Sequence, residues 1–284
     1  MNAEDVLAIV VSYNGLQKTR QAVASLRGQV GQVHVVDNGS GAESLAVLHS
    51  LEREEDVTVE RLGENRGVGH ALNLGVKRAR QMGLSWLLTM DQDSVVDVGM
   101  IQAYQAAIDR DPRLVSLSPQ IAGSGAKTDA VIHRIGSAIT SGNLVKLSLF
   151  DEVGLYDESF FIDSVDFDFC LRLRRAGHSI HRVSAAVMHH QLGEMREIPG
   201  VLRRYYADHS PLRRYYMSRN FMYMTERYLL RFPLFVLKLA AAHVLELVLV
   251  GFYDPRPLRS YRAVLRGVRD YIARRSGPYM ERAR

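Results

Sequence analysis

The chain has 284 residues, of which 47% are hydrophobic and 24% are charged. This composition excludes a disordered or fibrous protein and is sufficient for one large core or a core with an appendage. A single cysteine, Cys170, excludes an internal disulfide, fits a reducing compartment and is expected to be a packed apolar thiol.

The formal net charge of +5 is unevenly distributed along the chain. Residues 199–284 carry 16 Arg and one Lys against six acidic residues, a net charge of +11, whereas residues 1–198 carry −6. The basic region is therefore a candidate surface for phosphate groups or anionic lipid. It contains no recognised nucleic-acid-binding module, so we expect no nucleic-acid partner. Residues 1–5 contain no apolar segment of a secretory signal, and we expect a cytoplasmic protein.

The first ninety residues alternate continuous apolar runs with helical patterns. We expect strands at 6–11, 33–36, 57–62 and 86–90, and helices at about 16–26, 42–53 and 68–82. Continuous apolar strands separated by helices are typical of a parallel sheet covered on both faces. The sequence therefore predicts an α/β, doubly wound fold with a mainly parallel sheet.

The pattern loosens after residue 93. We expect a helix near 100–109, a strand at 114–118, a loop or hairpin over the polar stretch 122–141, a helix at 165–176 and a strand at 180–187. From residue 211 onward the chain is mainly helical in pattern. We therefore predict one α/β domain over 1–210, followed by a basic helical C-terminal region over 211–284.

The segment 234–250 is long and apolar but contains three ionisable residues, Lys238, His243 and Glu246. A membrane-spanning helix with three such groups is costly, whereas a helix in the headgroup region can keep a broad apolar face in lipid. We expect an interfacial helix, with a buried core or dimer helix as the alternative.

Polar residues follow three of the predicted strands. Asp91-Gln92-Asp93 comes directly after the strand at 86–90, and Ser12-Tyr13-Asn14 and Asp37-Asn38-Gly39-Ser40 end two others. The carboxyl ends of parallel strands converge on one crevice, where two carboxylates can hold a divalent ion with a diphosphate. Asp37 is suited to a base or ribose, with Tyr13 packing against the ring. Each segment alone could equally be a turn or a helix cap.

A glycine-containing turn, Glu64–His70, follows the third strand. It contains Gly-x-Gly, but Leu72 occupies the place of the third glycine of a dinucleotide-binding fingerprint, which argues against that motif. A turn of this kind can still bring backbone N–H groups to a nucleotide at the start of a helix. We expect Asn65 and Gly67 to contact it.

Residues 157–168 contain five acidic residues beside apolar side chains. A carboxylate in such surroundings is suited to act as a general base, because desolvation raises its pKa. Asp163 and Asp166 could instead cap and charge the first turn of the next helix. Further on, His189 and His190 follow a strand, where an imidazole could add a metal ligand or be structural.

In chain order these motifs resemble the family 2 inverting glycosyltransferases of GT-A fold, over roughly residues 6–230. The motifs that carry the resemblance are Val10–Asn14, Val36–Ser40, Asn65–Gly67 with Asn73–Gly75, Asp91–Asp93, Phe161–Asp166 and His190–Gly193. The D-Q-D-S and F-I-D-x-V-D forms, together with the segment 211–220, are most similar to bacterial rhamnosyltransferases.

The resemblance implies a role for each matching position. The expected nucleotide-sugar contacts are Tyr13, Asn14, Asp37, Asn65, Gly67, Asp91, Gln92 and Arg219, the last of these at the departing diphosphate. Asp93 and His190 would bind Mg²⁺ or Mn²⁺, and Asp166 would be the catalytic base. Many members of the family have a Glu-Asp pair at the base, whereas Val165 precedes Asp166 here. The second carboxylate is therefore Asp163, which we assign to acceptor contact.

The resemblance also implies a reaction. We expect inverting, metal-assisted transfer of L-rhamnose from dTDP-L-rhamnose to a hydroxyl of a glycan or lipid-linked acceptor of the cell envelope. The enzyme would be peripheral on the inner face of the cell membrane, bound to anionic lipid, with a homo-oligomer left open. A UDP-hexose donor and a catalytically inactive nucleotide-sugar-binding protein are the alternatives.

Overall fold

The structure, a computed structural model, describes residues 1–123, 131–190, 195–197 and 205–280. The chain forms two compact units. The first comprises Met1–Glu158 and Asp166–Gln191, and the second comprises Ser159–Val165 and Leu192–Arg284.

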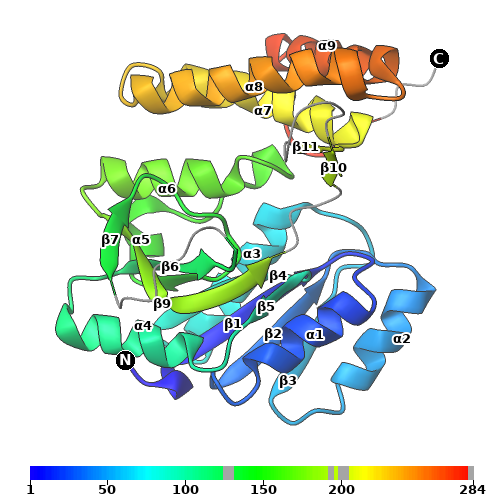
Figure 1. The fold of residues 1–284 in the computed structure, drawn as a ribbon. Coiled ribbons are helices and arrows are strands. Elements are labelled where there is room, and N and C mark those ends of the chain that lie inside the picture. Colours follow the sequence, from blue (N-terminus) through cyan, green and yellow to red (C-terminus); the bar gives the residue numbers. More distant parts are fainter. Residues whose placement is uncertain (124–130, 191–194, 198–204, 281–284) are drawn as a thin grey trace. The chain divides into compact units, whose positions relative to one another are not determined.

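The first unit is built on one sheet (Figure 1). Its strands are β1 (Val6–Ser12), β2 (Gln32–Asp37), β3 (Val57–Arg61), β4 (Trp86–Asp91), β5 (Ser94–Val96), β6 (Ser116–Ile121), β7 (Ile132–Ile135), β8 (Asn143–Lys146) and β9 (Ile180–His190). The sheet order is β3-β2-β1-β4-β8-β6-β9-β5, and β7 pairs with β9. The four N-terminal strands run parallel, whereas β8, β5 and β7 form antiparallel pairs with their neighbours. The sheet is therefore mixed.

Helices flank the sheet. They are α1 (Gln17–Leu26), α2 (Ala42–Leu51), α3 (Val68–Gln81), α4 (Met100–Arg110), α5 (Leu149–Val153) and α6 (Val165–Arg175), with short 3₁₀ turns at Ala3–Asp5 and Glu158–Phe160. Every residue of β1 is buried. Val6, Ala8 and Val10 belong to a core cluster with residues of α1, α2 and α4, while Ile9 faces Gly75 of α3. Because both faces of the strand are covered, its apolar run is continuous, and the α/β prediction is confirmed.

In this sheet, the short strands β5 and β8 were not predicted, and β7 lies in the stretch expected to be a loop or hairpin. Each has only three or four residues, too few for a periodic pattern, and polar positions interrupt them. They form because neighbouring strands satisfy their backbone groups, which is a tertiary effect. The polar stretch 122–141 thus contains β7, and residues 124–130 of that stretch lie outside the described part.

The second unit contains three helices, α7 (Pro211–Tyr228), α8 (Pro233–Tyr253) and α9 (Pro257–Ile272), and a two-stranded sheet of β10 (Met195–Glu197) and β11 (Tyr205–Ala207). Each helix has proline in its first turn, where the missing N–H has no intrahelical partner to lose. The Ser210 side chain caps α7 by accepting from the Arg213 N–H at 3.2 Å. A Cβ at Gly267 of α9 would overlap the Tyr215 carbonyl oxygen, so this glycine permits close packing of α9 on α7.

The contact between Gly75 and Ile9 gives a stability prediction. A Cβ at Gly75 would overlap the fully buried Ile9 side chain. The overlap should outweigh the helix-propensity gain of alanine, and Gly75→Ala should lower the free energy of unfolding by about 1 kcal/mol or more in urea titration. In the control, Gly136→Ala, the new Cβ meets only the end of Arg174 at 3.9 Å, and the change should stay within about 0.5 kcal/mol. Equal effects of the two variants would contradict this packing.

Candidate active site

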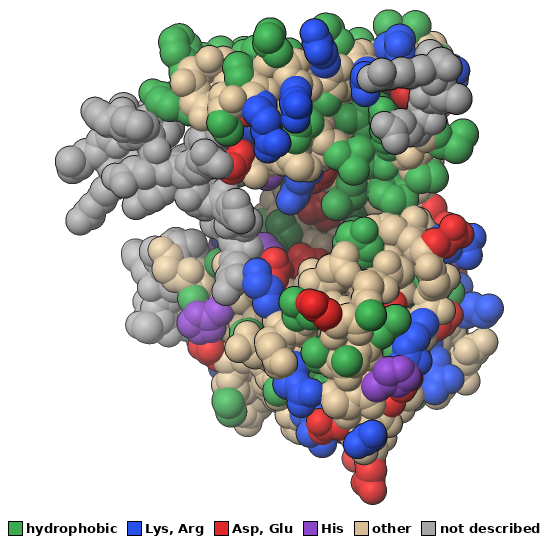
Figure 2. Space-filling view, turned by 90° about the vertical axis from the view of Figure 1, so that its right-hand side faces the viewer, with side chains coloured by type: hydrophobic (Ala, Val, Ile, Leu, Met, Phe, Trp, Pro, Cys, Tyr) green, Lys and Arg blue, Asp and Glu red, His purple; other side chains and the backbone are tan. Residues whose placement is uncertain are grey.

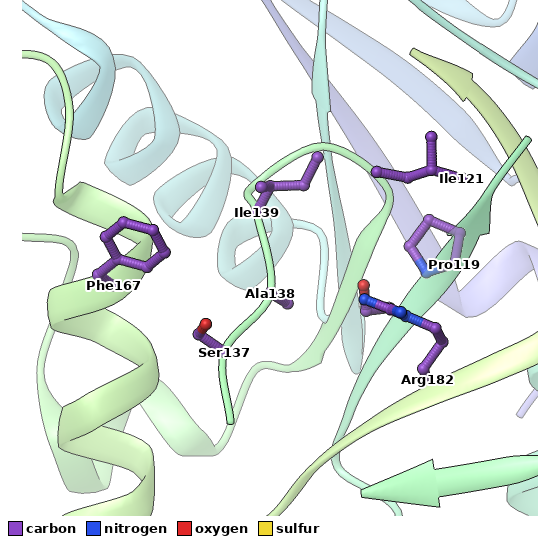
Figure 3. A pocket seen from close by; sticks show the side chains of 8 residues that line it. Pro119, Ile121, Ser137, Ala138, Ile139, Phe167 and Arg182 are labelled. Carbon is purple, nitrogen blue, oxygen red and sulfur yellow. The ribbon is translucent and has the colours of Figure 1, made fainter. Parts of the chain in front are cut away.

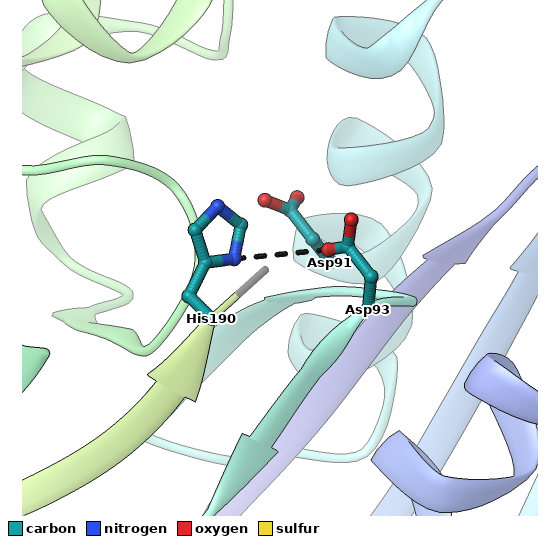
Figure 4. Close-up of side chains that lie close together, drawn as sticks. All are labelled: Asp91, Asp93 and His190. Carbon is teal, nitrogen blue, oxygen red and sulfur yellow. Dashed lines mark ion pairs between the residues drawn. The ribbon is translucent and has the colours of Figure 1, made fainter. Parts of the chain in front are cut away.

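Three potential metal ligands come together where β4, β5 and β9 meet. Asp91 ends β4, Asp93 lies between β4 and β5, and His190 ends β9. The antiparallel pairing of β5 with β9 places Ser94 opposite His190, so the imidazole lies beside the carboxylates. The distance from His190 Nδ1 to Asp93 Oδ1 is 3.7 Å, and one ligand atom from each of the three residues lies within 4.8 Å of the others (Figure 4).

The donor set of this cluster fits a divalent cation. Two carboxylates supply the hard oxygen ligands that Mg²⁺ and Mn²⁺ prefer, and the imidazole adds a nitrogen donor. All three side chains are partly exposed, which leaves coordination positions for water or phosphate oxygens. Asp91, Asp93 and His190 therefore fit the metal expected from the sequence.

Two buried serines form a hydrogen-bonded chain between Asp91 and His190. The Asp91 N–H donates to Ser141 Oγ at 3.1 Å, Ser141 Oγ donates to Ser94 Oγ at 2.7 Å, and Ser94 Oγ lies 2.7 Å from His190 Nδ1. Both serines are fully buried. When the Nδ1–H donates to Ser94, Nε2 is the ring nitrogen that carries a lone pair for a cation, as in other metal sites where a second bond fixes the imidazole.

Neither serine was predicted from the sequence to belong to the site. Ser94 directly follows Asp93, which was the available signal. Ser141 carried none, because its neighbours along the chain are polar loop residues and only the fold brings it to Asp91.

The polar residues at the three strand ends hold those ends together. The Gln92 side chain accepts the Tyr13 N–H at 2.7 Å and donates to the Tyr13 carbonyl at 3.1 Å. Asn14 accepts the Gly41 N–H at 2.9 Å, and its own N–H donates to Ser40 Oγ at 2.8 Å. The side chains of Gln92 and Asn14, both expected at the nucleotide sugar, are therefore engaged in joining the loops after β1, β2 and β4.

Asp37 differs from these residues because one of its oxygens has no partner among the described residues. Its side chain is 1% exposed, and Oδ2 accepts the Ser40 N–H at 3.2 Å, whereas Oδ1 is buried and unpaired. A buried carboxylate oxygen without a donor is unfavourable. A ligand N–H or O–H would satisfy it.

The loop before α3 lies next to Asp37. Asn38 Oδ1 accepts the Arg66 N–H at 2.8 Å, and Asn65 Oδ1 accepts the Gly67 N–H at 3.0 Å. Gly67, with φ 89°, precedes the first residue of α3. Its conformation is one that side chains rarely adopt, which explains the glycine at this turn.

Asp166 lies in the first turn of α6, in the first unit, and is partly buried. Its Oδ1 accepts the Phe167 N–H at 2.8 Å. This bond at a helix start is of the kind expected for a residue that charges the first turn, and it fixes the orientation of the carboxylate.

Asp163 and Arg219 belong to the second unit. Arg219 is 1% exposed, and its guanidinium donates to the Phe160 carbonyl at 3.0 Å and to the Gly277 carbonyl at 2.7 Å. This placement differs from the expected contact with a diphosphate, because backbone carbonyls occupy the donors. Asp163 Oδ1 accepts from Arg213 at 3.1 Å; burial raises the pKa of Asp163, and the charge of Arg213 opposes that rise.

A small cavity of about 100 Å³ lies between β6 and α6 (Figure 3). Pro119, Ile121, Ile139, Phe167 and Arg182 line much of it. Pockets for drug-sized ligands have volumes of roughly 300–1,000 Å³. A nucleotide sugar does not fit this cavity.

The serine chain gives a prediction about cation affinity. Ser94→Ala removes the hydrogen bond that orients His190, so the dissociation constant for Mn²⁺, measured by electron paramagnetic resonance on the free protein, should rise about tenfold. Ser116→Ala is the matched control, since Ser116 is equally buried in the same sheet but donates to Asn143 at 3.4 Å. An unchanged Mn²⁺ affinity in Ser94→Ala would exclude this role of the serine.

The chain is similar in sequence to known glycosyltransferases and synthases. The chain is 29% identical over 237 residues to the dTDP-rhamnosyl transferase RfbF of Shigella flexneri, covering 76% of this chain and 78% of the relative. It is 21% identical over 194 residues to the poly-beta-1,6-N-acetyl-D-glucosamine synthase of Staphylococcus aureus, covering 60% of this chain and 46% of the relative.

Solved structures share the fold. GalNAc-T7 with UDP, GalNAc and Mn²⁺ superposes with a TM-score of 0.62 at 17% identity, covering 79% of this chain and 48% of that chain. S. aureus TarS 1–349 in complex with UDP-GlcNAc gives a TM-score of 0.52 at 16% identity, covering 97% and 74%. The model of glycosyl transferase family 2 matches residues 7–167. The matched residues include β1, the strand-end motifs after β1, β2 and β4 and the start of α6, and the chain belongs to glycosyl transferase family 2.

Proposed function

We propose that this glycosyltransferase moves L-rhamnose from dTDP-L-rhamnose to a hydroxyl of a glycan or lipid-linked acceptor, with inversion at the anomeric carbon. The gathering of Asp91, Asp93 and His190 at the strand ends is the observation that carries the proposal. The choice of donor is supported by the relative from Shigella flexneri, a dTDP-rhamnosyl transferase.

Donor binding would use the strand-end residues. Asp37 Oδ1, buried and without a partner among the described residues, would accept from the thymine N3–H or a ribose hydroxyl. The exposed ring of Tyr13 would pack against the base. Asn65 and Gly67 would line the nucleotide. Gln92 and Asn14 would act by holding the strand ends in place.

The transfer would be a single displacement. Asp166 would accept the proton of the acceptor hydroxyl as its oxygen attacks the anomeric carbon, while the bond from that carbon to the diphosphate oxygen breaks on the opposite face. A divalent cation held by Asp93, His190 and Asp91 would neutralise charge on the diphosphate. Asp163 would contact the acceptor.

The acceptor is proposed to be lipid-linked because α8 exposes an apolar surface. Two of its three ionisable residues contact other helices of the second unit: the His243 ring stacks on Phe221 of α7 at 5.2 Å, and Glu246 Oε1 lies 3.5 Å from Arg214 Nε. Burial lowers the pKa of His243. It also raises the pKa of Glu246, against the opposing charge of Arg214.

The outward face of α8 is mainly apolar, although Lys238 is also exposed on it. Its large exposed side chains are Leu234, Leu237, Val244, Leu245, Val248 and Phe252. The helix is long and apolar enough to cross a membrane, and 11% of its most apolar stretch is buried. Figure 2 shows hydrophobic side chains at the surface of the helical region, with basic side chains beside them.

An interfacial position on an anionic leaflet suits this helix better than a spanning one. α8 packs along α7 and α9, and α9 exposes Arg259, Arg262, Arg266 and Arg269 in addition to Leu258 and Leu265. Arginines in the hydrocarbon core are costly, whereas at the headgroups they meet lipid phosphates. We infer a peripheral enzyme whose apolar face enters the headgroup region.

If Asp166 is the catalytic base, its replacement should lower the rate of sugar transfer without weakening nucleotide binding. Asp166→Asn keeps the size of the side chain but removes the basic oxygen, so turnover with dTDP-L-rhamnose should fall about 10²–10⁴-fold, while dTDP binding, measured by calorimetry, stays within about twofold. Asp151→Asn, at an exposed carboxylate of the same unit, should leave both unchanged. Full turnover in Asp166→Asn would remove this residue from the base role. Thermal stabilisation by UDP-hexoses but not by dTDP-L-rhamnose would contradict the donor.

The membrane assignment predicts a selective loss of vesicle binding. The double variant Leu237→Asp/Leu245→Asp places two charges on the exposed face of α8 and should lower the fraction sedimenting with phosphatidylglycerol vesicles at least fivefold, because burying each charge in the headgroup–acyl boundary is unfavourable. The control Val98→Asp/Leu155→Asp makes the same charge change on exposed residues of the first unit. Equal losses in the two proteins would indicate binding by net charge rather than by α8.

A further inference from the structure

The segment Ser159–Ser164, just before α6, has an unusual backbone. Phe161 (φ 67°), Asp163 (φ 62°) and Ser164 (φ 67°) all lie in the left-handed region, and none is glycine. Side chains disfavour this region because Cβ approaches the backbone carbonyl. Three such residues within four positions persist only where surrounding contacts over-determine the conformation.

Asn220 of α7 supplies several of those contacts. It is fully buried, and its Nδ2 lies 3.0 Å from the Phe160 carbonyl, 2.7 Å from the Ile162 carbonyl and 3.0 Å from the Asp163 carbonyl. One side-chain amide thus gathers three carbonyls of the segment. Buried carbonyls in an irregular segment need such donors, since no helix or sheet satisfies them.

The residues around Asn220 on α7 contact the same segment. Arg219 donates to the carbonyls of Ser159, at 3.3 Å, and Phe160, at 3.0 Å. The ring of Tyr216 stacks on that of Phe161, with centroids 5.1 Å apart and an interplanar angle of 15°.

Further toward the start of α7, Arg213 binds Asp163 Oδ1 at 3.1 Å. The contacts therefore come from positions 213, 216, 219 and 220, which share one face of the helix because they are spaced three to four residues apart. The other carboxylate oxygen of Asp163, Oδ2, is buried and has no partner among the described residues.

We propose that α7 acts as a clamp, in which Arg219 and Asn220 are positioning residues that hold Ser159–Ser164 with Phe161, Asp163 and Ser164 left-handed, and thereby fix Asp163 and the start of α6. The functional side of this inference rests on the proposed function, because Asp166 is the second residue of α6 and Asp163 is assigned to the acceptor. Because Oδ1 is held by Arg213, Oδ2 of Asp163 is the oxygen left to accept a hydrogen bond, and a hydroxyl of the acceptor is the class of group that would donate it. The clamp also gives a role to Arg213, Tyr216 and Arg219 of the segment 211–220, which the metal cluster does not use.

The experiment combines a substitution at Asn220 of α7 with a substitution at Ser164 of the segment Ser159–Ser164. Asn220→Ala removes the amide. Ser164→Gly removes the Cβ that disfavours the left-handed conformation, since glycine adopts it without that cost. Ser218→Ala is the control on α7, because Ser218 is equally buried but its hydroxyl donates within the helix to the Arg214 carbonyl at 2.6 Å.

Each full-length variant is measured for kcat and acceptor KM, for dTDP affinity, for Tm, and for deuterium uptake of residues 159–165 by mass spectrometry. Asn220→Ala should lower kcat/KM for the acceptor at least tenfold and speed deuterium uptake of this segment, with dTDP affinity within twofold. Ser164→Gly alone should change kcat/KM less than twofold. Added to Asn220→Ala, it should restore kcat/KM at least threefold and recover part of the lost Tm.

Two results would overturn the clamp: deuterium uptake and kcat/KM in Asn220→Ala that match those of Ser218→Ala, or no recovery on adding Ser164→Gly. If Asn220→Ala does not fold, Asn220→Ser, which keeps one donor, takes its place with the same criteria. If the wild-type protein transfers no sugar from any donor tested, the proposed function fails, while deuterium uptake and the Tm of the double variant still decide whether the clamp exists.

Discussion

The antiparallel pairing of β5 with the end of β9 is the contact on which the candidate site depends. It places Ser94 opposite His190, although 96 residues separate them, and so brings an imidazole to Asp93. Val96 and Met188, paired in the same ladder, are buried in the core and anchor the short strand. A shift of one residue would turn the His190 side chain to the other face of the sheet. Packing of the core therefore sets the geometry of the ligands.

Around the two proposed binding regions, some polar side chains are hydrogen-bonded to other parts of the protein. Others keep an atom that can accept a hydrogen bond from a ligand. Gln92 and Asn14 use their side chains on the loops after the strands, and Asn220 uses its amide on the segment before α6. Asp37 and Asp163, in contrast, each keep one buried carboxylate oxygen without a partner among the described residues. Because an unpaired buried oxygen is unfavourable in the free protein, those two atoms are the best candidates for contact with donor and acceptor.

The sequence predicted the elements of the first half well, because β1, β2 and β4 are almost entirely buried and mainly apolar. The metal ligands could be found from Asp91–Asp93 and from the resemblance. Ser141 could not, since only tertiary folding brings it to Asp91. The resemblance alone assigned Arg219 to a diphosphate, whereas its burial against backbone carbonyls depends on how α7 packs on Ser159–Val165. The domain boundary expected at residue 210 came from the helical pattern that begins at residue 211, and such a pattern carries no information about the packing of that short segment.

The most direct test of the central claim is a crystal structure of the full chain with dTDP and Mn²⁺, recorded with anomalous diffraction. We predict an anomalous peak within coordination distance of Asp93 and His190 and a diphosphate bound to that ion. The thymine N3–H or a ribose hydroxyl should donate a hydrogen bond to Asp37 Oδ1. An ion and nucleotide bound elsewhere, with Asp93 and His190 facing only water, would contradict it.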